Sequence, residues 1–345
     1  MFKSAILGCR GRARAHAKAY ESITRGKNVA ICDMNEEALH EFGDAFDIGQ
    51  RYTDIDQMLE KEKPDLLHIV TAPVLRGTNQ PIRYPLMNIA SEHQVPAVII
   101  EKPIAVMGED WRQIRDLSEQ TATKIAVNTQ LHFHPQNLEL KKDVAEGRIG
   151  EIKLIEASSR NPPVDQAPHV LQLISSYIDN SRPVKVMGQI AGKDQLESDQ
   201  PSPDNASARI LYANGVSASV TFGPAMAIRV LPDTGNNRHK RVCVFGTRGF
   251  VHWRFESWEK FTSAGGYQGG DLDYGEQDAV AQIGLTEAMF DWLEDESKVH
   301  PTNLQQSLAE FNLLLGIYQS GSLRKPIDLP FDPPDQLIQH MREIL

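Results

Sequence analysis

The stretch Val98-Ile99-Ile100-Glu101-Lys102-Pro103 is an apolar run that ends in an acid, a base and a proline. Its β-branched residues, flanked by Pro96 and Pro103, predict a short strand buried in a parallel sheet. Lys102 then lies at the carboxyl end of the strand, which is where open α/β sheets bind ligands. Lys102 is therefore a candidate active-site residue, although the motif taken alone favours a strand-end lysine that points to water.

A glycine turn follows the first predicted strand, Phe2 to Leu7. Gly8 and Ala13 fit the first and last positions of the dinucleotide-binding pattern G-x-G-x-x-G/A. Arg10 occupies the second glycine position, where its side chain either crowds a diphosphate or lies across it as a charge-assisted clamp. A glycine turn that binds no nucleotide is the other interpretation. The cofactor-binding candidates in this turn are Gly8, Arg10, Gly11, Arg12 and Ala13.

An acid ends the second predicted strand, Asn28 to Asp33, 25 positions after Gly8. This is close to the spacing of about 20 residues at which a carboxylate binds the adenosine ribose of NAD. Asp33 would also repel the 2′-phosphate of NADP, and Met34-Asn35 offers no adjacent arginine. The sequence therefore predicts NAD as the cofactor, with NADP disfavoured.

Strands alternate with helices over residues 1–127, which predicts a parallel sheet with right-handed crossovers, as in a Rossmann dinucleotide-binding domain. Further cofactor-binding candidates lie at carboxyl ends of predicted strands, and they are Thr71, Pro73, Glu101 and Lys102. The segment from Val74 to Tyr84, which contains Arg76, Asn79 and Arg83, is predicted to be a loop over the ligand.

The pattern changes over residues 128–345, where short strand-like runs are separated by Gly, Asn and Pro turns. They predict an antiparallel sheet with one face covered. Helical patterns bracket it at Gln136 to Glu146, His169 to Tyr177, Glu287 to Glu294 and Leu304 to Ser320. The segment from Gly265 to Gly270 is predicted to be a mobile loop. The predicted strands are Glu151 to Ser158, Lys185 to Ile190, Ala206 to Tyr212, Val216 to Phe222, Arg241 to Phe245 and Phe250 to Phe255.

Composition excludes several classes of protein. The chain has 345 residues, 41% of them hydrophobic, with 36 Lys and Arg against 46 Asp and Glu and a net charge of −10. An acidic chain has no general affinity for nucleic acid or anionic membrane. Cys9, Cys32 and Cys243 lack the pairing or spacing of a disulfide framework or zinc ribbon. We expect a cytoplasmic protein that partners neither nucleic acid nor membrane.

The order of motifs resembles the family of glucose–fructose oxidoreductase and inositol dehydrogenase over nearly the whole chain. Besides Glu101-Lys102-Pro103, the marks are Phe133-His134-Pro135, Gly147-Arg148-Ile149-Gly150-Glu151, Asp165 with His169, and Phe245-Gly246-Thr247-Arg248-Gly249. The resemblance implies a Rossmann domain followed by a C-terminal α/β domain with a large, mainly antiparallel open sheet. Arg10, His132 and Gln172 depart from the common residues of the family.

Asp165 and His169 form the second part of the candidate active site. On a helix, positions four apart face the same way, so a carboxylate and an imidazole can point together into a cleft. Pro168 fits only a first helical turn, which predicts Asp165 in the approach or cap and His169 just inside the helix. A near-neutral pKa suits a histidine that accepts the proton of an alcohol. The alternative interpretation is that Asp165 caps the helix and His169 is a buried packing residue.

The resemblance assigns the catalytic roles to Lys102, Asp165 and His169. In the related enzymes the histidine and the lysine flank the reacting carbon, and the aspartate helps to hold the alcohol or the histidine. His132 and His134 are two apart and would share the face of a strand, but a metal site needs further ligands. We therefore expect no metal, since nicotinamide chemistry needs none.

The leading functional hypothesis is an NAD(P)-dependent dehydrogenase acting on a secondary alcohol, or the corresponding ketone, of a sugar, polyol or glycoside. The alternatives are a non-oxidising sugar sensor and a glycoside-cleaving enzyme that holds its NAD throughout turnover. The family resemblance also implies a homodimer or homotetramer built through the C-terminal sheet, which agrees with the need to cover the bare face of an open sheet.

Overall fold

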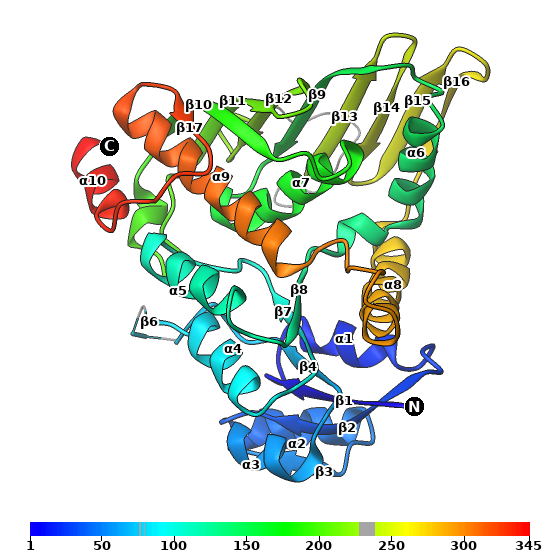
Figure 1. The fold of residues 1–345 in the computed structure, drawn as a ribbon, viewed down its shortest axis with the longest axis vertical. Coiled ribbons are helices and arrows are strands. Elements are labelled where there is room, and N and C mark those ends of the chain that lie inside the picture. The colour runs from blue at the N-terminus through cyan, green and yellow to red at the C-terminus, as the bar shows by residue number, and fades with distance from the viewer. Residues whose placement is uncertain (76, 79, 228–238) are drawn as a thin grey trace.

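A computed structural model describes residues 1–75, 77, 78, 80–227 and 239–345 of the chain. It contains a six-stranded sheet in the order β3-β2-β1-β4-β7-β8 and a nine-stranded sheet in the order β16-β15-β14-β13-β9-β12-β11-β10-β17. The small sheet lies below the large one in Figure 1, with helices on and between them. The expected fold class is confirmed.

All neighbouring strands of the small sheet run parallel. The strand order changes direction between β1 and β4, so the carboxyl ends of these strands mark the point where such sheets bind ligands. Val98, Ile99 and Ile100 are fully buried in β7, as their apolar run predicts. The strands are β1 (Phe2–Leu7), β2 (Gly26–Cys32), β3 (Gln50–Tyr52), β4 (Leu66–Ile69), β7 (Ala97–Glu101) and β8 (Lys124–Asn128).

The connections of the small sheet are mainly helical. They are α1 (Ala13–Ala19), α2 (Glu36–Ala45), α3 (Ile55–Glu62), α4 (Arg83–Glu92) and α5 (Gly108–Ser118). The segment predicted as a loop over the ligand is instead a short hairpin of β5 (Val74–Leu75) and β6 (Gln80–Pro81), and α4 follows it directly. Arg76 and Asn79 lie outside the described residues.

The large sheet is antiparallel except for the parallel pair β9 and β12. The predicted loop at residues 265–270 is wrong, because β16 pairs there with β15. A Cβ at Gly270 would lie 3.2 Å from the indole Nε1 of Trp258, so the glycine makes room for the ring. The strands are β9 (Ile152–Ser159), β10 (Pro183–Ala191), β11 (Asn205–Tyr212), β12 (Ser217–Phe222), β13 (Lys240–Gly246), β14 (Gly249–Arg254), β15 (Ser257–Thr262), β16 (Gly266–Asp271) and β17 (Ile327–Asp328).

Helices cover one face of the large sheet. Helix α7 packs on β9, β12 and β13, while α9 contacts β10 and β11 of the large sheet and also α5 and β8 of the N-terminal part. These contacts join the two sheets around shared helices (Figure 1). The remaining elements are η1 (Gln130–Phe133), α6 (Pro135–Ala145), α7 (Pro163–Tyr177), η2 (Asp194–Glu197), α8 (Tyr274–Glu294), α9 (Leu304–Leu323) and α10 (Leu337–Ile344).

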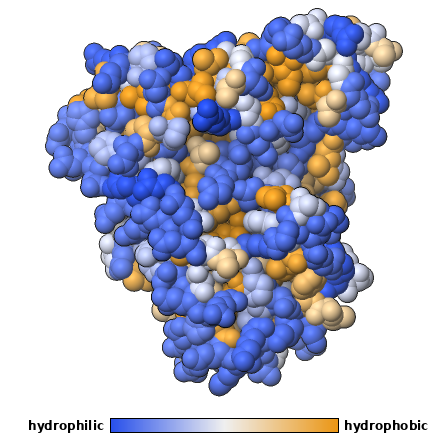
Figure 2. Space-filling model, in the orientation of Figure 1, coloured by the Kyte–Doolittle hydropathy of each residue, from blue (hydrophilic) through white to orange (hydrophobic). Residues whose placement is uncertain are grey.

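Hydrophilic side chains cover most of the face shown in Figure 2. Apolar side chains gather in the middle of the view, between the parts built on the two sheets, and along the edge of the large sheet. None of the helices in the described residues has the length and apolar character that a membrane span requires.

Candidate active site

Lys102 and Asp165 form an ion pair at the carboxyl end of β7. The Lys102 ammonium donates to Asp165 Oδ1 at 2.6 Å and to the Asp165 main-chain carbonyl at 2.8 Å. The second carboxylate oxygen accepts from Asn161 Nδ2 at 2.6 Å and from Gln166 Nε2 at 3.1 Å. Burial opposes ionisation of Asp165, but the Lys102 charge and these hydrogen bonds lower its pKa. Asp165 is therefore an ionised carboxylate, fixed by hydrogen bonds, that orients the Lys102 ammonium.

Helix α7 begins earlier than Pro168 predicts. Pro163 occupies the first helical position, where its fixed φ is favourable, so Asp165 lies inside the first turn and not in the approach or cap. Pro168 is within the helix and leaves the carbonyl of Val164 without its usual donor. The expected position of Asp165 is corrected accordingly, and His169 lies a full turn further on.

His169 is buried on the same helix, with 4% of its surface exposed. Its Nδ1 has no hydrogen-bond partner among the described residues. Burial lowers the pKa of the imidazole well below 6.5, and the nearby charges of Lys240, Lys102 and Arg12 lower it further. The expected near-neutral pKa is therefore wrong. The ring is neutral at physiological pH, the form in which it can accept a proton.

Lys240 is a buried lysine that sequence reasoning missed. It is the first residue of β13 and is 4% exposed. Its ammonium lies 3.4 Å from the Tyr274 hydroxyl, 5.2 Å from the centre of that ring and 5.6 Å from the centre of the Phe255 ring. Burial lowers the pKa of Lys240 to about 7, and the charge of Lys102 adds to the effect. Nothing in the local sequence distinguishes it from other strand-end lysines.

A chain of buried hydrogen bonds holds Glu101. Tyr20 Oη lies 2.7 Å from His68 Nε2, His68 Nδ1 lies 2.9 Å from His16 Nδ1, and His16 Nε2 lies 3.0 Å from Glu101 Oε1. Asn128 Nδ2 donates to the same carboxylate oxygen at 2.5 Å. Burial lowers the pKa of both imidazoles, so each ring is neutral and can donate a hydrogen bond through one nitrogen and accept one through the other. Burial alone would raise the pKa of Glu101, but hydrogen bonds from His16 and Asn128 and the charge of Arg12 help to lower it to about 2.

The glycine turn leaves room beside its backbone. Gly8 has φ +96°, and a Cβ there would lie 2.7 Å from the Val70 carbonyl oxygen, so only glycine fits. Gly11 has φ +55° and no neighbour within 4 Å of an added Cβ. Ala13 is buried at the start of α1, whereas Arg10 is exposed. A surface pocket of about 320 Å³ is lined by Cys9, Arg10, Gly11, Arg14, Glu37, Ala38 and Glu41. This turn therefore fits a dinucleotide.

Asp33 joins the end of β2 to the glycine turn. Its Oδ2 accepts from the Cys9 amide at 2.8 Å and its Oδ1 from the Asn35 amide at 2.9 Å. The carboxylate thus lies beside the turn, as the spacing from Gly8 predicts. Each oxygen retains a lone pair that can accept from a ribose hydroxyl.

Arg12 points toward α8. Its Nη1 lies 2.5 Å from Asp278 Oδ2 and its Nη2 lies 3.1 Å from Gln282 Oε1. Asp278 also accepts from Gln130 Nε2 at 2.7 Å and lies 3.7 Å from His134 Nε2. The guanidinium therefore links the glycine turn to the C-terminal part of the chain, and a role of Arg12 toward the cofactor remains a prediction.

Arg83 supports the corner that follows β7. It is buried, and its guanidinium donates to the carbonyls of Pro103 at 3.3 Å and Lys102 at 3.4 Å and to Thr71 Oγ1 at 3.3 Å. Burial lowers its pKa to about 10. Pro73 is buried nearby in sequence, and its carbonyl accepts from the Ile82 amide at 2.9 Å. Thr71 and Pro73 thus help to shape the strand ends.

His132 and His134 do not lie on a strand. The first belongs to the 3₁₀ helix η1 and the second is its C-cap, so the expected shared face is wrong. His132 Nδ1 lies 3.1 Å from Gln172 Nε2, which joins two of the residues that depart from the family pattern. Among the described residues no group of three or more His, Cys, Asp or Glu side chains is arranged to hold a metal ion, and the absence of a metal remains a prediction.

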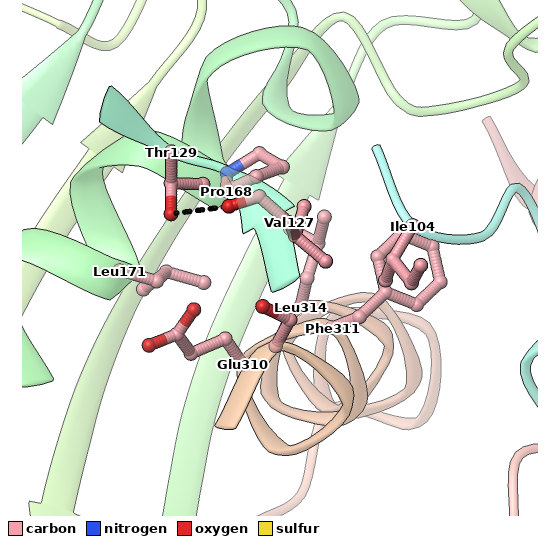
Figure 3. A pocket seen from close by; sticks show the side chains of 9 residues that line it. Ile104, Val127, Thr129, Pro168, Leu171, Glu310, Phe311 and Leu314 are labelled. Atoms are coloured by element: carbon pink, nitrogen blue, oxygen red, sulfur yellow. Dashed lines mark hydrogen bonds between the residues drawn. The ribbon is translucent and has the colours of Figure 1, made fainter. Parts of the chain in front are cut away.

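A small apolar cavity backs the active-site helix (Figure 3). Its volume is about 10 Å³, close to the minimum for about one water molecule. Pro168 and Leu171 of α7 line one side, and Glu310 and Phe311 of α9 line another. Glu310 accepts from Gln306 Nε2 at 2.9 Å, and burial raises its pKa to about 8. The contact between α7 and α9 thus includes a protonated carboxyl group at neutral pH.

Glu310→Gln is expected to stabilise the protein as the pH rises. Because the pKa of Glu310 is higher in the folded state than in the unfolded state, its contribution is fully present below about pH 4.5 and is lost as the pH approaches 8. Urea unfolding should show the variant more stable than wild type at pH 8 by about 1–3 kcal/mol, with a smaller difference at pH 5. Exposed Glu139→Gln is the control. A pH-independent difference for Glu310→Gln would contradict this.

Comparison with known proteins finds a family match for the N-terminal part of the chain. Residues 2–129 match the family described as an oxidoreductase family with an NAD-binding Rossmann fold. This match covers the N-terminal domain and not the rest of the chain. The match contains the glycine turn, Asp33 and Lys102, and it confirms the expected NAD-binding fold.

Two curated relatives match less than half of the chain. D-apiose dehydrogenase from Paraburkholderia graminis is 30% identical over 149 residues, which are 43% of this chain and 38% of that protein. Inositol 2-dehydrogenase from Rhizobium meliloti is 26% identical over 163 residues, which are 46% of each chain. The chain thus spans less than half of the length of the curated relatives that it matches.

A solved structure shares the whole fold. Levoglucosan dehydrogenase in complex with NADH superposes with a TM-score of 0.80 at 16% identity, covering 95% of this chain and 99% of that one. At this identity the likeness extends to the arrangement of both sheets and not to the individual site residues.

Proposed function

We propose that the protein is an NAD-dependent oxidoreductase that transfers hydride between the nicotinamide and a secondary alcohol or ketone of a sugar, polyol or glycoside. The observation that carries the proposal is the meeting of Lys102, Asp165 and His169 in one site, from elements more than sixty residues apart. The relatives named D-apiose dehydrogenase and inositol 2-dehydrogenase support a carbohydrate substrate.

In the proposed chemistry one residue accepts a proton and another stabilises a negative charge. When bound, the nicotinamide supplies the hydride acceptor. Neutral His169 takes the proton of the substrate hydroxyl, and the Lys102 ammonium stabilises the negative charge that develops on the same oxygen. Asp165, hydrogen-bonded from three side chains, keeps the ammonium oriented. The lowered pKa of His169 keeps the base in its neutral form below pH 6.5.

We assign dinucleotide binding to residues 1–127, and substrate binding and oligomerisation to residues 128–345. Gly8, Gly11 and Ala13 form the turn beside the diphosphate, and Arg10, exposed at its edge, is available to lie across it. Arg12, Thr71, Pro73 and Glu101 remain cofactor-binding candidates at the strand ends. The three cysteines are free thiols, which fits the cytoplasm.

Asp33→Ala is expected to relax the preference for NAD over NADP. Its carboxylate lies at the end of β2 beside the glycine turn, where it would accept from ribose hydroxyls and repel a 2′-phosphate. Titration of both dinucleotides should show a preference for NAD of at least about tenfold in wild type and its loss in the variant. Asp44→Ala, on the outside of α2, is the control. Tighter binding of NADP by wild type would refute the assignment.

We further propose a homodimer or homotetramer built through the open face of the large sheet. Arg209, Met187 and Leu211 are exposed there, with half-buried Ser219 and Thr221 beside them. This mixed face suits pairing of two sheets by polar and apolar contacts together. Sedimentation at micromolar protein should give a dimer or tetramer, and Leu211→Arg should shift it toward monomer. A wild-type monomer at that concentration would refute the proposal.

The experiment that tests the function begins with the purified protein. Mass spectrometry of any copurified nucleotide is followed by a screen of sugars and polyols with NAD, read at the absorbance of NADH. We expect NADH to accumulate with at least one substrate. Nucleotide that stays bound through gel filtration, with sugar converted and no net NADH, would favour the glycoside-cleaving alternative. Sugar binding without any conversion would favour the sensor.

A further inference from the structure

Lys240 has a role that the proposed chemistry does not use. We infer that its ammonium binds an anionic group, a carboxylate or a phosphate, carried by the carbohydrate substrate. The inference rests on the proposed function, because it assigns a substrate class to the same site. Its consequence is that the enzyme acts on sugar acids or sugar phosphates in preference to neutral sugars.

The position of Lys240 puts it beside the reacting groups. It pairs with Ser159 at the end of β9, the strand that leads into α7, and it faces Tyr274 at the start of α8. Strand β13, which begins at Lys240, packs against α7, the helix that carries His169. Lys240 therefore lies close enough to the proposed base to reach a group on the same small substrate.

Two other cations of the site, Lys102 and Arg12, already have carboxylate partners. Lys102 is paired with Asp165, and Arg12 is paired with Asp278. Both oxygens of Asp165 are occupied by Lys102, Asn161 and Gln166. Among the described residues, no carboxylate lies within ion-pair distance of the Lys240 ammonium. The site thus contains a buried amine that has no carboxylate counter-ion among the described residues.

Burying an ammonium without a counter-ion is unfavourable in free energy, and a bound anion would supply the counter-ion. The rings of Phe255 and Tyr274 lie 5.6 and 5.2 Å from the ammonium and stabilise a cation only modestly. The low pKa of about 7 reflects this imbalance, because burial disfavours the charged form. A carboxylate or phosphate beside Lys240 would favour the protonated amine and form a charge-assisted hydrogen bond.

A second cation lies at the same strand end. Arg160 follows Ser159, and its amide donates to the His239 carbonyl at 3.2 Å. Its Nη1 donates to the Ala227 carbonyl at 3.1 Å, while its buried Nε has no partner among the described residues. Arg160 thus adds positive potential next to Lys240 without a carboxylate of its own among the described residues.

The test compares carbohydrates that differ in one terminal group. D-Glucose, D-glucuronate and D-glucose 6-phosphate form one set, and D-sorbitol with D-gluconate and D-galactose with D-galacturonate form two more. Each is assayed with NAD at pH 7 for kcat and KM, using wild type, Lys240→Met and Lys240→Arg. Exposed Lys153→Met is the control. The carboxylate and phosphate members separate the two sources of the anion.

We expect one anionic member to exceed its neutral counterpart in kcat/KM by about 10- to 100-fold. Lys240→Met should remove this preference, chiefly through a higher KM for the anionic member. Lys240→Arg should keep the preference, because the guanidinium is always charged. Thermal unfolding and NAD titration show that each variant is folded and binds the dinucleotide.

The dependence on pH separates recognition from a structural role. Above about pH 7, kcat/KM for the anionic member should fall in wild type as Lys240 loses its proton, and Lys240→Arg should move this limb upward. Among the described residues, the charged and titratable groups facing Lys240 are Arg12, Lys102, His134, Asp165, His169, Tyr274 and Asp278. None of them is altered in the two variants.

Two results would overturn the inference. In the first, neutral members are oxidised as well as their anionic counterparts. In the second, Lys240→Met lowers kcat equally for both, which would make Lys240 a proton-transfer group. In either case NADH formation by wild type leaves the proposed function standing, whereas a failure to bind NAD removes the proposed function itself.

Discussion

Lys102→Ala is expected to lower turnover at least about a hundredfold while NAD binding survives. The ammonium stands at the carboxyl end of β7, held by the Asp165 carboxylate at 2.6 Å. Removing it takes away the positive charge opposite the oxygen that loses its proton and leaves Asp165 without its cation. Both effects act in the transition state, so the loss should appear in kcat.

The measurement is steady-state oxidation of the substrate found in the screen, with NAD affinity determined separately. Lys102→Arg should recover little, because the guanidinium is longer and its charge is spread over a plane. Lys153→Ala is a matched control, since that lysine forms a pair with Glu151 at 2.6 Å on the exposed start of β9. Turnover near the wild-type rate in Lys102→Ala would move the active site elsewhere.

His169→Ala should cause a loss of similar size, for a different reason. Burial, with the charges of Lys240 and Lys102, keeps the pKa of the His169 imidazole well below 6.5. Without it the hydroxyl proton has no acceptor in the proposed chemistry, and we expect kcat to fall at least about a hundredfold. His169→Gln preserves a hydrogen-bonding side chain but not the base and should be equally impaired.

The pH profile provides the independent readout. Because the pKa of His169 is lowered, the acid limb of kcat/KM should lie below pH 6.5 in wild type and should be absent from the residual activity of His169→Gln. NAD affinity should be unchanged in both variants, since the residue lies on α7 and not in the glycine turn. A variant that retains wild-type kcat would show that another group takes the proton.

Local patterns were sufficient for the small sheet. The apolar run at Val98 to Ile100 reports a strand buried on both faces, and Asp33 follows the glycine turn at a characteristic distance. Both signals depend on residues that are neighbours in the chain. Lys102 could be placed at a strand end for the same reason.

Two elements of the C-terminal part were missed because their stability comes from distant partners. The glycines of β16 read as a loop, but they pair with β15 and give space to the Trp258 indole. Helix α8 begins at Tyr274, thirteen residues before the predicted start at Glu287, where Asp273 caps it by accepting from the Glu276 amide at 3.0 Å. Gly275 and Gly284 weaken the helical signal within that stretch.

In the candidate site, too, the residues with a local motif could be predicted from the sequence, and their distant partners could not. The motifs at Lys102 and at Asp165 with His169 could be recognised, but the partners that tune them could not. Lys240 acts on His169 through space, from a strand with no distinctive pattern. Pro168 misled the placement of α7, because a proline within a helix is tolerated when packing on both sides holds it.

The ion pair between Arg12 and Asp278 spans 266 residues and joins the turn proposed for the diphosphate to the helix whose first residue meets Lys240. The two ligands would therefore share an electrostatic partner. Thermodynamic reciprocity then requires that if a bound dinucleotide changes the affinity for the carbohydrate by some factor, the carbohydrate changes the affinity for the dinucleotide by the same factor. Arg12 and Asp278 are thus positioned to couple binding of a dinucleotide at the glycine turn to binding of a carbohydrate beside Lys240.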